Sequence, residues 1–269
     1  SKITNGDLKG LTLKEAYEKQ PTLFTEKVYD KFPLLIKILD ASDNLSVQVH
    51  PEDDYARENE NGELGKTECW YVLDVKEGTK LVYGHTAKTK EEFNDKIDRE
   101  QWQELFIEEE VKAGDFFYIP AGTLHAIGEG ILIYEVQQNS DTTYRVYDYD
   151  RVDKDGNKRE LHIEKTKDVT KVPFEKVTTS PREEKLEGAT VTYLAAEKYF
   201  SVFKVEVEGR VSLEKTRTGN LFTVLNGSGS IEIDGSSYDV KKGDSFILTT
   251  DCRTYTLKGE MFLIGSYDR

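Results

Sequence analysis

Four polar side chains in the first half of the chain are of the types that bind a divalent metal ion. Gln48 and His50 stand two residues apart in "SVQVHP", Glu68 follows in "GKTECWYV", and His125 comes after the turn in "IPAGTLHAI". One amide oxygen, two imidazoles and one carboxylate together suit a borderline ion such as zinc. The pattern therefore predicts a metal site if the four side chains converge.

The same histidines also have structural interpretations, which spacing alone does not exclude. His125 could be a hydrogen-bonded core histidine, and His50 could cap the end of a strand. His85 and His162 have no partner pattern and are expected to be structural. Cys69 points away from its neighbour Glu68 in a strand, so it is expected to lie in the core.

The strands around these residues turn polar groups toward an otherwise apolar face. Side chains two apart in a strand share a face, so Gln48 and His50 lie together, opposite two valines. Lys37 lies on the apolar face of "PLLIKIL", and Glu135 lies on that of "ILIYEVQ". Burying such groups singly costs several kcal/mol unless they are paired. We therefore expect a first barrel with a charged, solvated interior.

Short strand-like segments dominate the chain and predict an all-β fold. Val, Ile and Thr are plentiful and aromatic residues make up 11% of the sequence, a composition that favours sheet. Gly, Asp and Pro turns between the segments indicate a barrel or a two-sheet jelly roll. A short helix is expected at 12–19, where Thr12 and Glu15 form a capping box. A helical insertion is expected at 88–106.

Two pairs of segments repeat along the chain. "VKAGDFFYIPAGTLHAI" (111–127) aligns without gaps on "VKKGDSFILTTDCRTYT" (240–256). "ECWYVLDVKEG" (68–78) aligns in the same way on "NLFTVLNGSGS" (220–230). This internal duplication predicts two related β-domains.

The second copy lacks the polar residues of the first. His125 falls on Thr254 and Glu68 falls on Asn220, so we expect only the first domain to bind metal. The expected organisation is a catalytic domain at 1–165, a linker or wrapping segment at 166–196, and a metal-free second domain at 197–269.

The composition argues against some classes of binding partner and favours one cellular compartment. The 269 residues carry a net charge of −14 spread along the chain, which argues against a nucleic-acid or membrane-surface binder. No segment approaches the about 20 apolar residues of a membrane span, and the first residues lack a signal-peptide core. Because only Cys69 and Cys252 are present, a cytoplasmic location is expected. The sequence is compatible with a monomer or a homodimer.

Four motifs in order resemble type I phosphomannose isomerase (mannose-6-phosphate isomerase), in particular its shorter bacterial form. They are "SVQVHP", "GKTECWYV", "GDFFYIPAGTLHAI" and "QQNSDTTYRVYDYDR". The resemblance runs from about residue 10 to the C-terminus. It implies two cupin-type jelly-roll domains, one zinc ion per chain, and interconversion of the sugar phosphates mannose 6-phosphate and fructose 6-phosphate.

The resemblance also assigns site residues. It makes zinc ligands of Gln48, His50, Glu68 and His125. It marks further pocket residues at Lys37, Ser46, Lys66, Glu135, Asp141 and Arg145. The family also has an N-terminal strand region, with a Trp and a Glu near the pocket, that this sequence lacks, so we expect an incomplete form of the family's chain. Longer members have a His where this chain has Gly65.

Aldose–ketose isomerisation moves a proton between C1 and C2 through an enediolate, so negative charge grows on the sugar oxygens. With neutral Gln and His ligands, Zn²⁺ and Glu68 leave about one positive charge in surplus, which suits a Lewis acid. Arg145 suits the phosphate or a developing oxyanion, and Lys37 with Ser46 could also hold the phosphate. The acid–base candidates are Glu135, Asp141 and Lys66.

Two other functions compete with the isomerase. An oxidative cupin enzyme is one, although non-haem iron oxygenases favour a facial triad or more imidazoles over a Gln ligand. The other is a metal-binding cupin that binds a sugar phosphate without turnover.

Overall fold

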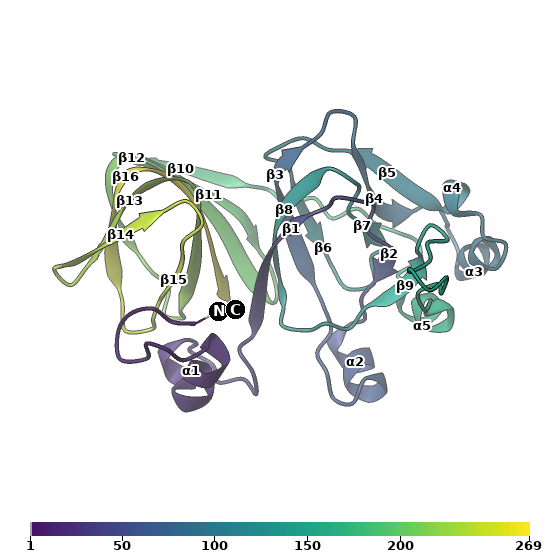
Figure 1. Cartoon of the computed structure of the whole chain (residues 1–269), viewed down its shortest axis with the longest axis horizontal. Helices are drawn as coiled ribbons and strands as arrows, with labels where there is room; N and C mark the ends of the chain where they lie inside the picture. The colour runs from purple at the N-terminus through teal and green to yellow at the C-terminus, as the bar shows by residue number, and fades with distance from the viewer. Residues whose placement is uncertain (1) are drawn as a thin grey trace. The chain divides into compact units, whose positions relative to one another are not determined.

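β-Strands make up most of the chain, which confirms the predicted all-β class. The computed structural model describes residues 2–269, and the chain divides into two units (Figure 1). One unit is Leu35–Thr178, and the other combines the residues up to Leu34 with Thr179–Arg269. Among the described residues, no helix is long and apolar enough to cross a membrane.

The unit Leu35–Thr178 is a sandwich of two antiparallel sheets. The first sheet has the order β1 (Leu34–Asp40), β8 (Ile131–Gln138), β3 (Glu68–Val75) and β6 (Phe116–Ile119). The second has the order β5 (Phe106–Glu110), β4 (Lys80–His85), β7 (His125–Ala126), β2 (Val47–Val49) and β9 (Tyr144–Tyr147). Trp70 and Val72 of β3 pack with Leu81 and Tyr83 of β4, so the two sheets share an interior.

Helices cover the outer face of the second sheet. They are α3 (Lys90–Asp98), α4 (Trp102–Leu105) and α5 (Ile163–Val169), while α2 (Asp53–Asn59) lies in the connection between β2 and β3. Val47 and Val49 pack with Phe93 of α3 in one apolar cluster. Because the valines of β2 face this helical layer, Gln48 faces the interior of the sandwich. The polar residues of β2 thus face inward as expected, and α3 and α4 lie within the range 88–106 where a helical insertion was expected.

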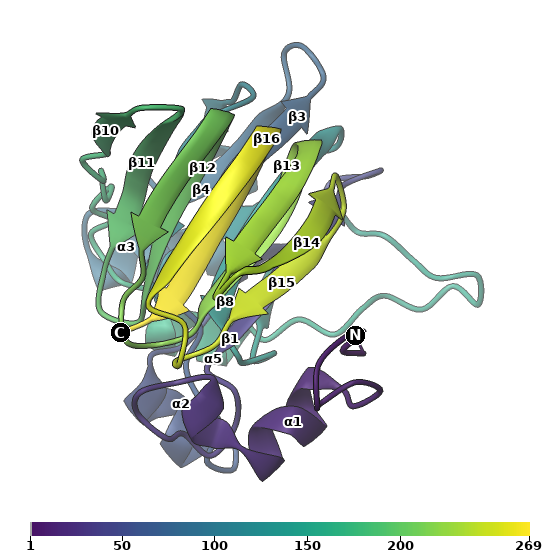
Figure 2. The same ribbon diagram turned by 90° about the vertical axis from the view of Figure 1, so that its left-hand side faces the viewer.

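The second unit is one seven-stranded sheet (Figure 2). Its strands are β10 (Arg182–Leu186), β11 (Ala189–Ala196), β12 (Phe200–Glu214), β16 (Thr254–Asp268), β13 (Asn220–Ile233), β14 (Ser236–Lys241) and β15 (Ser245–Leu248). Gly209, Gly259 and Gly229 stand at one register across β12, β16 and β13. A Cβ on Gly229 would lie 2.0 Å from the Lys258 carbonyl oxygen, and Gly209 and Gly259 have φ angles of 129° and 123°, which favour glycine. The row lets the three long strands bend around an apolar core.

The N-terminal segment belongs to this second unit. The helix α1 (Leu13–Lys19) has the predicted capping box, in which the Glu15 N–H donates to Thr12 Oγ1 at 3.2 Å. The short helix η1 (Pro21–Leu23) follows, and the Leu23 carbonyl accepts from the Thr250 N–H at 2.9 Å. The Phe24 carbonyl accepts from the Gly219 N–H at 2.9 Å.

The unit boundaries differ from the expected division at 1–165, 166–196 and 197–269. Residues 2–34 bind the second unit through the hydrogen bonds above. These bonds join segments that are far apart in the sequence, so sequence patterns do not predict them. The backbone N–H of Lys171 donates to the Gly122 carbonyl at 2.9 Å, and Phe174 packs on Tyr83, so this part of the expected linker belongs to the first unit. The rest of the expected linker forms β10 and β11. The edge strand β10 is rich in charged residues, as exposed edges commonly are, and this gave it the composition of a linker.

Strand register confirms the internal repeat. Glu68 pairs with Ile119 in the first unit, and Asn220 pairs with Leu248 in the second. The gap-free alignments place these residues on each other. β3 and β13 also each carry a register irregularity four residues farther on. The duplication is therefore preserved down to single cross-strand residue pairs.

His85 is a buried histidine outside the metal-ligand pattern, as expected. Its side chain is 3% exposed, and its Nε2 donates to the Lys171 carbonyl at 2.9 Å. The ring packs between Phe93 and Phe174. Burial lowers the pKa of His85 below its ordinary value, and the hydrogen bond to the carbonyl offsets this only in part.

This lowered pKa predicts a pH dependence of stability. Below the unfolded pKa of about 6.5, the unfolded chain takes up a proton at His85 that the folded protein does not, so the stabilisation is present above this pH and is lost as the pH falls. His85→Gln has no titrating group at this position, so its unfolding free energy lacks the part of the pH dependence that comes from His85. We therefore expect the difference in unfolding free energy between wild type and His85→Gln to shrink between pH 7 and pH 5. Urea titrations in the presence of a chelator measure it, and a difference that is independent of pH contradicts the prediction.

Candidate metal centre and its cavity

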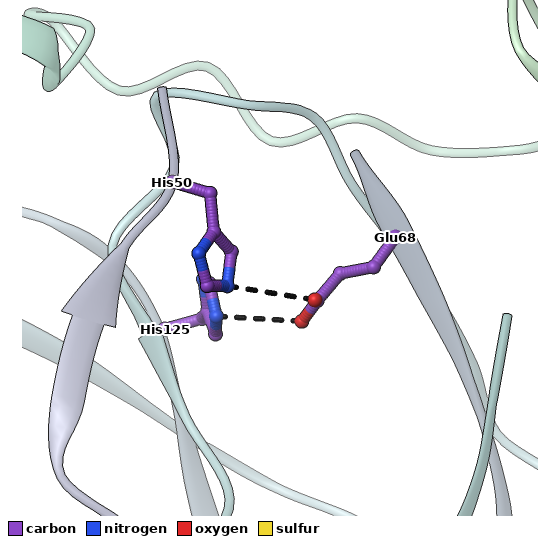
Figure 3. A group of neighbouring side chains, drawn as sticks. All are labelled: His50, Glu68 and His125. Carbon is purple, nitrogen blue, oxygen red and sulfur yellow. Dashed lines mark ion pairs between the residues drawn. The ribbon is translucent and has the colours of Figure 1, made fainter. Parts of the chain in front are cut away.

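Three predicted ligands meet in the interior of the first unit (Figure 3). His50 follows β2, His125 begins β7, and Glu68 begins β3 in the opposite sheet. Nε2 of His50 lies 3.5 Å from Glu68 Oε2, and Nε2 of His125 lies 3.3 Å from Glu68 Oε1. One potential ligand atom from each of the three residues lies within 4.8 Å of the other two. Their side chains are at most 1% exposed.

Both histidines are held in the form that binds a metal. Nδ1 of His50 donates to the Thr142 carbonyl at 2.8 Å, and Nδ1 of His125 donates to the Thr123 carbonyl at 2.9 Å. Each Nε2 therefore keeps its lone pair, which faces Glu68. Burial, followed by the charge of Lys66, lowers the pKa of His50 well below its ordinary value and that of His125 to about 4. Both imidazoles are thus neutral at pH 7, as metal binding requires.

Gln48 completes the predicted set from the neighbouring strand. It pairs with His125 between β2 and β7, and its Nε2 lies 3.4 Å from His125 Nε2. Rotation of the amide by half a turn would present Oε1 to the cluster instead, since the two ends of an amide have the same shape. The structure therefore brings the predicted ligands Gln48, His50, Glu68 and His125 to one place.

The donor set fits a divalent cation. Glu68 Oε1 is buried and has no hydrogen-bond partner among residues 2–269, which is a costly state for a carboxylate oxygen. A metal ion bonded to this oxygen and to the two Nε2 atoms would satisfy all three. Two imidazoles, a carboxylate and an amide are ligands that zinc accepts.

Lys66 is next to the cluster. Its Nζ contacts Glu68 Oε2 and lies 3.0 Å from His50 Nε2. Burial acts to lower the pKa of Lys66, but the charges of Glu68, Glu135 and Asp141 together raise it. Lys66 is therefore a cation in this arrangement, and an added positive charge would be needed to make it a base.

A cavity of about 410 Å³ adjoins the cluster. Six predicted site residues line it: Lys37, Gln48, Lys66, Glu135, Asp141 and Arg145. Ser46 is linked to this set, since its Oγ accepts from Arg145 Nε at 3.2 Å. Sequence reasoning missed the other lining residues: Leu39, Leu45, Trp70, Ile127, Thr143 and Arg159. Trp70 could have been found, because it stands two residues after Glu68 on the same face of β3, whereas no periodicity marks Arg159.

Glu135 projects from β8 into this cavity and is 3% exposed. Its Oε2 accepts from Trp70 Nε1 at 2.9 Å, and its Oε1 lies 3.5 Å from Lys37 Nζ. Burial and the negative charge of Glu68 raise the pKa of Glu135, against the opposite effect of the nearby lysines. A carboxyl group with a raised pKa is suited to take up and release protons near neutral pH.

Arg145 of β9 is held in position by β2 and by the segment that precedes α5. It pairs with Gln48 across the sheet, and its Nη1 donates to the Glu160 carbonyl at 2.9 Å. Its backbone N–H donates to His162 Nδ1 at 3.2 Å, and the His162 N–H donates to the Arg145 carbonyl at 2.7 Å. His162, which precedes α5, thus has the structural role expected of it.

The chain matches known proteins over nearly its whole length. Residues 1–73 match the phosphomannose isomerase type I catalytic domain, and residues 189–268 match the mannose-6-phosphate isomerase cupin domain. Mannose-6-phosphate isomerase ManA of Bacillus subtilis is 48% identical over 99% of this chain and 85% of that protein. Mannose-6-phosphate isomerase of Streptococcus mutans is 46% identical over 99% of this chain and 84% of that protein. The chain belongs to the type I phosphomannose isomerase family.

Solved structures of this family share the fold. The mannose 6-phosphate isomerase from Bacillus subtilis superposes with a TM-score of 0.95 at 42% identity, over 99% of this chain and 85% of that chain. A zinc-bound mannose 6-phosphate isomerase superposes with a TM-score of 0.78 at 16% identity, over 96% of this chain and 86% of that chain. The predicted two-cupin architecture of the phosphomannose isomerases is confirmed.

The cluster predicts a selective loss of metal binding. We expect His125→Ala to weaken zinc binding at least about tenfold, or about 1.4 kcal/mol, because it removes a neutral nitrogen donor from the site. His85→Gln changes another buried histidine of the same unit and should bind zinc as wild type does. Competition with a chromophoric chelator measures the three affinities. Equal affinities of His125→Ala and wild type would show that the cluster is not the zinc site.

Proposed function

We propose that this protein interconverts mannose 6-phosphate and fructose 6-phosphate, with one Zn²⁺ held by Gln48, His50, Glu68 and His125. The observation that carries the proposal is the buried cluster of two neutral imidazoles and one carboxylate beside a cavity lined with charged side chains. Family membership supports the reaction, and the donor types support the metal. Two free, buried cysteines support a reducing cytoplasm as the location.

The ligand set determines the charge of the centre. When bound, Zn²⁺ supplies Lewis-acid stabilisation of the negative charge that develops on the sugar oxygens. Glu68 is the single anionic ligand, so about one positive charge remains at the centre. Gln48 contributes an oxygen without neutralising that charge, which gives a chemical reason for an amide in this position.

Glu135 is our choice for moving the proton between C1 and C2. Its pKa is raised and it lines the cavity. Trp70 Nε1 donates to its Oε2, and Lys37 Nζ lies 3.5 Å from its Oε1. Asp141 and Lys66 line the same cavity and are the remaining candidates for acid–base roles. Glu135 would take the proton from one carbon, leaving an enediolate, and return it to the other carbon. The nearby cations stabilise the negative charge of the enediolate.

The cavity also suits an anionic substrate in an otherwise acidic protein. Lys37, Lys66 and Arg145 all line it, while the whole chain carries a net charge of −14. Locally gathered positive charge attracts an anion regardless of the net charge. Arg145, which hydrogen-bonds Ser46, offers a planar fork to the phosphate or to a developing oxyanion.

A coupled assay tests the proposed reaction. We expect the zinc-loaded protein to convert mannose 6-phosphate to fructose 6-phosphate, to lose this activity on chelation, and to recover it when zinc is restored. Sugar-phosphate binding without turnover would instead support a binding cupin. Oxygen consumption with an iron-loaded protein would support an oxidative one.

Arg145→Ala separates metal binding from turnover. We expect this variant to keep its zinc, because Arg145 contacts none of the three clustered ligands, and to lose at least about tenfold in turnover, or about 1.4 kcal/mol of barrier. Elemental analysis and the coupled assay on the same sample measure both. Normal turnover in Arg145→Ala would exclude the role given to this residue.

A further inference from the structure

The loop that leads into β3 is bound to the start of α2 by backbone N–H groups. The Gly65 N–H donates to Asp53 Oδ1 at 2.9 Å, and the Lys66 N–H donates to the Pro51 carbonyl at 3.1 Å. Loops that connect strands commonly run over the surface and are mobile, whereas Lys66 is only 5% exposed. This loop is therefore held inside the first unit.

Gln138 of β8 closes these contacts into a ring. Its Oε1 accepts from the Thr67 N–H at 2.9 Å, and its Nε2 donates to Asp53 Oδ1 at 3.0 Å. Asp53 Oδ1 thus accepts two hydrogen bonds, one from the loop and one from Gln138. Hydrogen bonds to a carboxylate are stronger than those between neutral groups. We call the ring of Asp53, Gly65, Thr67 and Gln138 the Asp53–Gln138 bridge.

Gly65 permits the close approach on which the bridge depends. A Cβ at this position would lie 2.5 Å from the Asp53 nitrogen and 2.6 Å from the Pro51 carbonyl oxygen. Both are backbone atoms, which cannot move aside as the end of a flexible side chain can. The backbone of the loop therefore packs directly on the backbone at the start of α2.

The bridge joins the segments that carry the clustered zinc ligands. His50 immediately precedes the segment that contacts the loop, and Glu68 immediately follows Thr67. Thr67 Oγ1 also accepts from the Ala121 N–H at 3.2 Å, in the turn before His125. None of these hydrogen bonds involves a donor atom of a ligand. The bridge can therefore act on the metal centre only through the positions of the three backbones.

We propose that Asp53 and Gln138 are positioning residues of the metal centre, which hold the loop so that Glu68 faces the two imidazoles. This inference rests on the zinc centre proposed above. Zinc binds nitrogen and carboxylate oxygen at about 2.0 to 2.2 Å, so a small shift of a ligand's backbone weakens the bond. The same loop carries Lys66, whose Nζ contacts Glu68, so the bridge positions both side chains.

The test removes the bridging carboxylate and measures zinc affinity. We expect Asp53→Ala to weaken zinc binding about tenfold, because the loop that carries Glu68 loses its bond at Gly65. Asp53→Asn keeps an oxygen at the same place without the charge, so it should restore most of the affinity. Competition with a chromophoric chelator measures each affinity, and circular dichroism shows whether each variant is folded.

Asp54→Ala is the matched control, since it removes the same charge from the next position. The side chain of Asp54 is 92% exposed and pairs with Arg57 at 3.0 Å on the surface of α2. This variant should bind zinc as wild type does. Equal losses in Asp54→Ala and Asp53→Ala, or in Asp53→Asn and Asp53→Ala, would show that the charge acts rather than the hydrogen bonds, and would overturn the inference.

Gln138→Met cuts the bridge from its other end, and it decides the matter if Asp53→Ala does not fold. We expect it to lose zinc affinity to a similar extent, and wild-type affinity in the folded variant would also overturn the inference. These affinities do not depend on turnover. If wild type binds zinc without isomerising the sugar phosphate, the isomerase proposal fails and the role of the bridge is still tested. If wild type binds no zinc, both proposals fail.

Discussion

The carboxylate of Glu68 between two neutral imidazoles is the constraint on which the first unit depends. An unpaired carboxylate in this position would be costly, and the surrounding structure is arranged around it. His50 and His125 are fixed by backbone carbonyls through Nδ1 and turn Nε2 toward Glu68. The helices that cover the other face of the second sheet allow β2 to place its valines outside and its polar residues inside. The interior of the sandwich therefore contains charged side chains that can bind a metal ion and an anionic substrate.

The second unit shows the same architecture without this constraint. Trp70 pairs with Glu135 between β3 and β8, and the corresponding pair in β13 and β16 is Phe222 and Gly265. A Cβ on Gly265 would lie 2.3 Å from the Phe203 ring, so an aromatic side chain fills the space. Where the first unit has a charged cavity, the second has a packed core, although the strand register is preserved.

Several features could be predicted from the sequence because they depend on local patterns. Alternation along strands revealed the inward polar residues, the Thr12–Glu15 pair revealed a helix start, and the gap-free repeats revealed the duplication. Other features depend on contacts between distant segments. Residues 2–34 join the second unit through the carbonyls of Leu23 and Phe24, and β10 resembles a linker because it is an exposed edge. Arg159 is likewise brought to the cavity by an irregular hairpin that has no periodicity.

Residue identity and spacing are enough to predict the candidate ligand types, the all-β class, the repeat and the family. Folding sets which ring nitrogen of each histidine faces Glu68, how burial and neighbouring charges shift the pKa values, and which arginines share the cavity. The physical reason is that protonation and pairing depend on distances of a few ångströms in a buried setting. Those distances are set by segments that come together only on folding.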